Sequence, residues 1–87
     1  MEIEFDPAKD LSNRQKHGLS LALAGVVLRH RLGEIIDPRH GMELRMIAFG
    51  LLAGRLCVLV YTRRGEVFRV ISLRKANGKE QARWLRE

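Results

Sequence analysis

The chain has 87 residues, of which 46% are hydrophobic and 30% are charged. This length leaves room for one hydrophobic core, so residues 1–87 are interpreted as a single domain, and the composition excludes an intrinsically disordered chain. Lys and Arg outnumber Asp and Glu by 16 to 10, and the net charge of +6 favours a polyanionic partner. Because the sequence shows no secretory signal and no apolar stretch of about 20 residues, we expect a cytoplasmic protein without membrane contacts.

The beginning of the chain predicts a short strand followed by a helix. Apolar and acidic residues alternate up to Phe5, which indicates a strand over residues 3–5. Asp6 is a preferred N-cap and Pro7 suits the first helical position, so a helix is expected to run to about His17. Gly18 then ends this helix in the left-handed conformation.

A second helix and a loop are expected next. Ser20 is a suitable start, and residues 21–30 are almost continuously apolar, which favours a buried helix. Residues 32–41 contain Gly33, the pair Asp37-Pro38 and another glycine. These residues predict a loop with at most a brief extended piece at residues 34–36.

Three strand-like segments follow, over residues 43–52, 55–63 and 67–75, separated by gaps short enough for hairpins. The middle segment is apolar on both faces, as in a central strand, and its Cys57 is expected to be a small buried hydrophobe. Asn77 followed by Glu80 is a capping-box pattern that opens a final helix carrying Trp84. The sequence therefore predicts an α+β fold with two N-terminal helices, an antiparallel sheet and a short C-terminal helix.

Alternation along the last strand separates its arginines. A period of two places Ser72 and Arg74 on one face, and Arg69 on the other among aliphatic residues. Such an arginine needs an acidic partner, reaches the sheet edge, or binds a phosphate. One core is expected between helices and sheet, formed by Leu23, Val26, Val27, Ile47, Phe49, Val58, Val60, Ile71 and Leu73.

Most cofactor chemistries find no support in the sequence. His17, His30 and His40 are far apart and Cys57 is far from all three, so no metal-ligand spacing is present. The chain also lacks a phosphate-binding glycine-rich loop and a serine nucleophile elbow. No metal and no cofactor are therefore expected. The arginines and lysines remain, and they suit nucleic acid.

The chain resembles the BrnT toxin family along nearly its whole length. The residues that carry the resemblance are Phe5-Asp6-Pro7, Lys16-His17-Gly18, Asp37-Pro38 with His40, Glu43 with Arg45, Gly50, and the run from Arg69 to Asn77 with Glu80. Two aromatic positions depart from the family pattern, since Phe5 replaces a frequent tryptophan and Trp84 is the nearest counterpart of a tyrosine in the last helix. The resemblance implies a RelE-like ribonuclease toxin of a type II toxin–antitoxin system. It also implies a ribbon-helix-helix antitoxin, through which alone the complex would contact DNA.

Cleavage of RNA by its own 2′-hydroxyl needs a base, an acid and cations around the phosphate, and no metal. Together with the resemblance, this requirement makes Lys16, His17, Glu43, Arg69 and Arg74 the catalytic candidates. The base is His17, Glu43 or Lys16, with His40 as a further candidate, while the two arginines would bind the scissile phosphate. Lys16 and His17 equally suit a helix end stabilised by its dipole. The candidates for binding RNA elsewhere are Arg45, Arg63, Lys75, Lys79 and Arg83.

Two other function classes would share part of this pattern. A non-catalytic basic module that binds RNA or the ribosome would have the same positive face, and substitution of Arg74 would then weaken affinity without abolishing any turnover. A DNA-binding domain is disfavoured because the second helix is apolar rather than basic. Tyr61 could stack on a base, but its place in a central strand favours the core.

Overall fold

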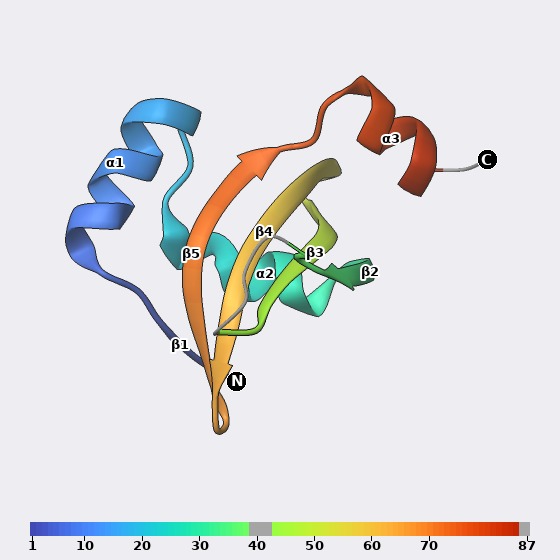
Figure 1. Ribbon diagram of the computed structural model, residues 1–87. Coiled ribbons are helices and arrows are strands. Elements are labelled where there is room, and N and C mark those ends of the chain that lie inside the picture. The colour runs from blue at the N-terminus through green and yellow to red at the C-terminus, as the bar shows by residue number, and fades with distance from the viewer. Residues whose placement is uncertain (39–42, 86–87) are drawn as a thin grey trace.

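The computed structural model describes residues 1–38 and 43–85. In this part the chain forms a five-stranded sheet in the order β1-β5-β4-β3-β2, flanked by helices (Figure 1). The elements in chain order are β1 (Glu2–Glu4), α1 (Pro7–His17), the 3-10 helix η1 (Leu21–Leu23), α2 (Ala24–Arg29), β2 (Arg31–Ile36), β3 (Arg45–Leu52), β4 (Arg55–Arg64), β5 (Val67–Lys75) and α3 (Gly78–Trp84). None of the helices described here is long and apolar enough to cross a bilayer.

The helix ends follow the local signals in the sequence. The Asp6 side chain accepts a hydrogen bond from the backbone N–H of Ala8 at 2.8 Å, and Gly18 ends α1 with φ of 72°. The second helix differs in detail, because Ser20 caps a turn of 3-10 helix before α2 begins at Ala24. The capping box of α3 is present, with Asn77 and Glu80 each bonded to the other's backbone N–H. These predicted helices and their caps are confirmed.

The sheet is mixed, and this corrects the expected antiparallel sheet. Strands β2 to β5 pair antiparallel in sequence order, with β4 central as predicted, but β1 adds to the edge of β5 in parallel. The predicted loop was also partly wrong, since β2 is a six-residue strand that includes Gly33. A Cβ at Gly33 would lie 2.4 Å from the Trp84 ring. This glycine therefore admits a close contact within a strand and does not interrupt it.

A β-bulge in β5 overturns the predicted separation of its arginines. Tyr61 pairs with Val70, and the preceding Val60 pairs with Ser72, so Ile71 is an extra residue in β5. The alternation shifts by one residue at this point. Arg69, Ser72 and Arg74 consequently lie on the same face of the sheet, because their partners Thr62, Val60 and Val58 alternate regularly along β4.

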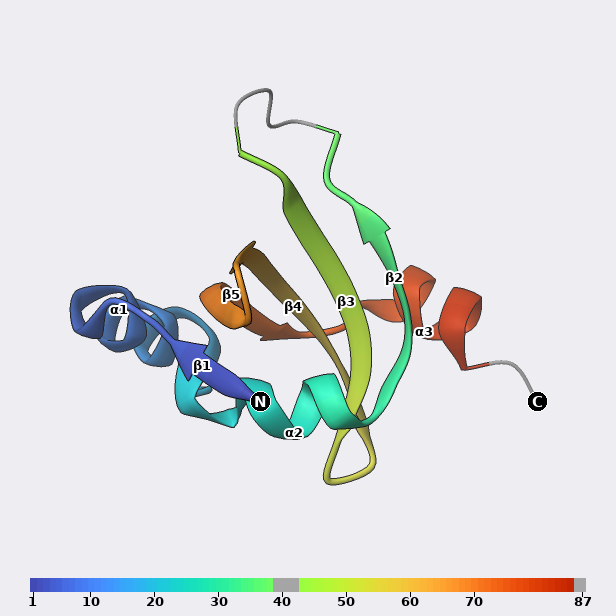
Figure 2. The same cartoon turned by 90° about the horizontal axis from the view of Figure 1, so that it is seen from below.

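Helices cover the two faces of the sheet unequally. α2 lies behind the strands in Figure 1, and Figure 2 shows it and α3 on different sides of the central strands. We call the face turned away from α2 the open face; from the strand register it carries Arg45, Thr62, Arg69, Ser72 and Arg74. α3 covers one end of this face, where Trp84 stacks on Phe49 with ring centroids 4.6 Å apart.

The buried side chains form two clusters, one on each face, so the expectation of a single core was wrong. The cluster under α2 includes Val27, Leu73, Cys57 and Tyr61, the last two buried as predicted. Burial raises the pKa of the Cys57 thiol. The cluster under α3 contains Phe49 and Val58, with Ile47 and Trp84 packed against them. A central strand that is apolar on both faces supplies side chains to both clusters.

We predict that Gly33→Ala displaces α3. The new methyl group would overlap the Trp84 ring, and relief of that overlap should cost about 1–3 kcal/mol of folding free energy. Trp84 is the one tryptophan of the chain, so its fluorescence reports the contact directly. Gly78→Ala is the matched control, because a Cβ there meets nothing within 4 Å. Equal melting temperatures and emission spectra for the two variants would contradict this packing.

Candidate active site between α1 and the sheet

A pocket of about 210 Å³ lies between α1 and the edge of β5. Its lining residues are polar or basic except for one, and they are Lys9, Ser12, Asn13, Lys16, His17, Ile71 and Ser72. The β5 side of the pocket consists of the bulge residue Ile71 and its neighbour Ser72. The α1 side presents two lysines and a histidine, so the pocket suits an anionic group.

Asn13 holds α1 against β5 and thereby shapes this pocket. Its side chain is buried, and its Nδ2 donates hydrogen bonds to the backbone oxygens of Leu19 and Leu73, both at 2.8 Å. Its Oδ1 accepts a hydrogen bond from the Leu73 N–H at 3.1 Å. β1 pairs with β5 only as far as Arg69, so Asn13 takes the place of a neighbouring strand further along. α1 is therefore docked at the edge of the sheet (Figure 1).

Lys16 and His17 are in the last turn of α1 and are exposed at the pocket. The structure brings these two predicted catalytic residues together beside Ser72. Their catalytic roles stay a prediction. The other polar residues of the pocket were not predicted, although Lys9, Ser12, Asn13 and Lys16 have the spacing of one helix face.

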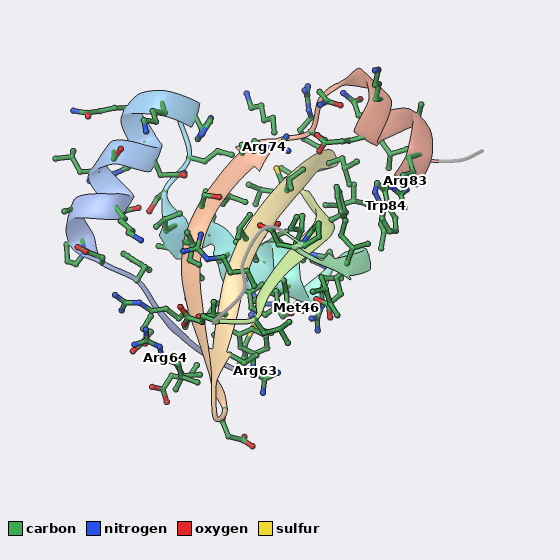
Figure 3. All side chains as sticks on the ribbon, viewed as in Figure 1. Met46, Arg63, Arg64, Arg74, Arg83 and Trp84 are labelled. Carbon is green, nitrogen blue, oxygen red and sulfur yellow. The ribbon has the colours of Figure 1, made fainter. Side chains whose placement is uncertain are left out.

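Arg74 is on the open face at the end of β5, between α1 and α3 (Figure 3). Its Nη1 and Nη2 donate hydrogen bonds of 2.8 Å to the two carboxylate oxygens of Glu80. The same carboxylate accepts a hydrogen bond from the backbone N–H of Asn77, as part of the capping box. The hydrogen bonds from Arg74 are the main reason that the pKa of Glu80 is lowered, and the pKa of Arg74 is raised by the same pairing. Arg74 thus ties α3 to the sheet.

Arg69 is held more loosely than Arg74. Its Nη1 lies 3.6 Å from a carboxylate oxygen of Glu4, which is also 4.0 Å from Arg64. Glu43, the other candidate base, lies outside the pocket and pairs with Arg64 at 3.8 Å. The structure therefore separates Glu43 from Lys16 and His17. Its role as a base also stays a prediction.

The candidates for binding RNA lie on different surfaces. Arg45 is on the open face, next to Thr62 of β4. Arg63 is on the other face, with its guanidinium 4.3 Å from the centre of the Phe68 ring and bonded to the Gly65 carbonyl. Figure 3 shows Arg63 and Arg64 on different sides of the hairpin end. The remaining candidates are exposed near or on α3, and they are Lys75, Lys79 and Arg83.

Within residues 1–38 and 43–85, no group of three or more His, Cys, Asp or Glu side chains is placed to hold a metal ion. His40, the further candidate base, lies outside the described residues.

We predict that the ion pair between Glu80 and Arg74 makes the folding stability depend on pH in the acidic range. The pKa of Glu80 in the folded protein is below its ordinary value of 4.5. The ion pair therefore contributes its full stabilisation at pH values above 4.5, and this stabilisation is lost as the pH falls through the lowered pKa of the folded state. Both groups are partly exposed, so the contribution is on the order of 1 kcal/mol. Glu80→Gln should lower the melting temperature near neutral pH, and the difference from the wild type should shrink as the pH falls through the lowered pKa of Glu80. The exposed Glu66→Gln is the control, and an equal loss at neutral and acidic pH for Glu80→Gln would contradict this assignment.

Comparisons with known proteins identify the family and agree with the fold. The family model described as "Ribonuclease toxin, BrnT, of type II toxin-antitoxin system" matches residues 5–80. The crystal structure of the Brucella abortus ribonuclease toxin BrnT is similar, with a TM-score of 0.68 and 29% sequence identity over 88% of this chain and 97% of that one. No curated protein matches the sequence. Since the family match covers most of the chain and the α+β fold agrees, the chain belongs to the BrnT family of ribonuclease toxins of type II toxin–antitoxin systems.

Proposed function

We propose that this toxin cleaves RNA at the pocket between α1 and β5, without a metal ion, by attack of the substrate's own 2′-hydroxyl. The observation that carries the proposal is the position of Ser72. It lines the pocket together with Lys16 and His17, and on the open face it lies between Arg69 and Arg74. Groups able to transfer protons and groups able to bind a phosphate therefore lie on either side of Ser72.

The reaction requires two proton transfers. The 2′-oxygen attacks the phosphorus as its proton passes to a base, and the departing 5′-oxygen receives a proton from an acid. The products are a 2′,3′-cyclic phosphate and a 5′-hydroxyl. We assign the base to His17, since histidine is the commonest residue in this role, and the acid to Lys16 one residue before it.

The phosphate would be bound from the open face. A guanidinium offers two parallel donors that match phosphate oxygens, and it stays charged throughout the reaction. Arg69 is the first choice because its ion pair with Glu4 spans 3.6 Å and leaves its donors available. Arg74 would contribute a second positive charge, held in place by Glu80.

The antitoxin partner follows from the family, and we propose that it is a ribbon-helix-helix protein that covers the open face. Burial of several arginines requires opposite charges or hydrogen bonds from the partner. The contact surface of the antitoxin is therefore expected to be acidic. A complex that leaves Arg69, Arg74 and Lys75 exposed would contradict this masking.

Cleavage is predicted to continue in excess EDTA. Purified toxin, free of its antitoxin, should cut single-stranded RNA to fragments that end in a 2′,3′-cyclic phosphate or 3′-phosphate and begin with a 5′-hydroxyl. Activity that disappears with EDTA and returns with magnesium, or fragments with 5′-phosphates, would reject the mechanism. Binding of RNA without any cleavage would instead support a non-catalytic RNA- or ribosome-binding module.

His17→Ala is predicted to lower the single-turnover rate by about a hundredfold or more, because general acid–base catalysis typically contributes this much. His30→Ala is the matched control, since His30 is exposed at the end of α2, away from the pocket. Both variants should melt within a few degrees of the wild type. Equal rates for the two variants would exclude His17 as the base or acid.

A further inference from the structure

A row of side chains crosses the open face outside the pocket. Strand register places Arg45 of β3 opposite Thr62 of β4, Thr62 opposite Arg69 of β5, and Arg69 opposite Glu4 of β1. Two arginines thus flank one threonine on the same face. Glu4 closes the row at the β1 edge, where it lies 3.6 Å from Arg69.

Two polar atoms in this row, one in Thr62 and one in Arg45, have no hydrogen-bond partner in the part of the chain that the structure describes. Thr62 is only 1% exposed, and its hydroxyl is buried without a hydrogen-bond partner. The Nε of Arg45 is also buried without a partner. Buried polar groups are nearly always paired, because an unpaired one lowers stability, and exceptions call for a specific explanation. Arg74 shows the contrast, since it makes two hydrogen bonds of 2.8 Å to Glu80.

We propose that Arg45, Thr62 and Arg69 form a second phosphate-binding subsite, which holds the phosphate next to the scissile one in a bound RNA. The two guanidinium groups would supply charge and the Thr62 hydroxyl a neutral donor. This inference rests on the proposed function, because Arg69 is shared between the row and the scissile phosphate. It identifies single-stranded RNA longer than a dinucleotide as the preferred substrate.

The dimensions of the sheet allow this arrangement. Neighbouring strands lie about 4.8 Å apart, so Arg45 and Arg69 start about 10 Å apart, and two arginine side chains can reach one phosphate between them. Thr62 is directly beneath that position. Because its hydroxyl is covered in the free protein, the side chains around it have to move when the phosphate binds. The loose ion pair of Arg69 permits that movement.

Affinity for non-cleavable RNA tests the subsite directly. The probes are 2′-O-methyl oligonucleotides of two and four nucleotides, measured by fluorescence anisotropy at several salt concentrations. Arg45→Gln should weaken binding of the tetranucleotide about tenfold. The slope of the logarithm of the binding constant against the logarithm of the salt concentration should fall in magnitude by about 0.7, the value for one lost phosphate contact. Binding of the dinucleotide, which has a single phosphate, should change little. Arg29→Gln removes the same charge from α2 on the other side of the sheet and is the control.

Thr62→Val provides a second test with effects of opposite sign. Removal of an unpaired buried hydroxyl should raise the melting temperature by a few degrees, because no hydrogen bond within the protein is lost. The same change should weaken binding of the tetranucleotide about tenfold. A purely structural residue would not combine higher stability with lower affinity.

These outcomes separate the subsite from the proposed catalysis. Because the probes carry no free 2′-hydroxyl, their affinities do not depend on whether the toxin cleaves RNA as proposed. If Arg45→Gln binds the tetranucleotide as tightly as Arg29→Gln does, or if Thr62→Val binds it like the wild type, the subsite is wrong even if cleavage proceeds as proposed. If both variants lose affinity while no RNA is cleaved, the subsite stands and the catalytic proposal fails.

Discussion

The extra residue in β5 determines which side chains meet on the open face. Val70 and Leu73 both belong to the core under α2, although three positions separate them, and only the bulge at Ile71 allows this. The bulge also turns Ser72 to the same face as Arg69. Without it, burial of Val70 would bring Ser72 and Arg74 to the core face and turn Leu73 away from the core. The wall that β5 contributes to the pocket, and the placement of Ser72 and Arg74 on the same face as Arg69, depend on this local shift.

The positive charge of the chain is divided between structural and available arginines. Arg74 is bonded to Glu80, Arg63 lies over Phe68, and Arg31 donates to the Leu28 carbonyl and lies near Glu34. Glu34 also accepts a hydrogen bond from the hydroxyl of Tyr61, and burial together with this hydrogen bond raises the pKa of Tyr61 to about 12. These contacts stabilise the ends of the sheet. Among the residues that the structure describes, Arg45 and Arg69 have no partner as close as these, which leaves both available to an external anion.

The sequence predicts the features that depend on neighbouring residues. The caps at Asp6, Gly18 and Asn77 were all evident, because each signal lies within a few residues of the turn that it determines. The central position of β4 was evident as well, since its apolar residues occupy both faces. The family resemblance came from the same short runs of residues.

Features that depend on distant contacts could not be predicted in this way. No residue type specifies the bulge at Ile71, which arises where β5 passes from pairing with β1 to contact with Asn13 of α1. Gly33 looked like an interruption, because the Trp84 ring that requires it lies about 50 residues further along the chain. For the candidate site, the pattern named Lys16, His17 and Arg69 as separate candidates, and their positions around Ser72 follow only from the fold.

The central claim is that RNA binds across the open face with its scissile phosphate at the pocket of α1 and β5. A titration of isotope-labelled toxin with a 2′-O-methyl oligonucleotide, followed by backbone amide chemical shifts, tests this claim most directly. The largest changes should occur at Lys16, His17, Thr62, Arg69 and Ser72, while the amides of α2 stay nearly unchanged. Changes concentrated on α2, with the pocket residues unaffected, would contradict it.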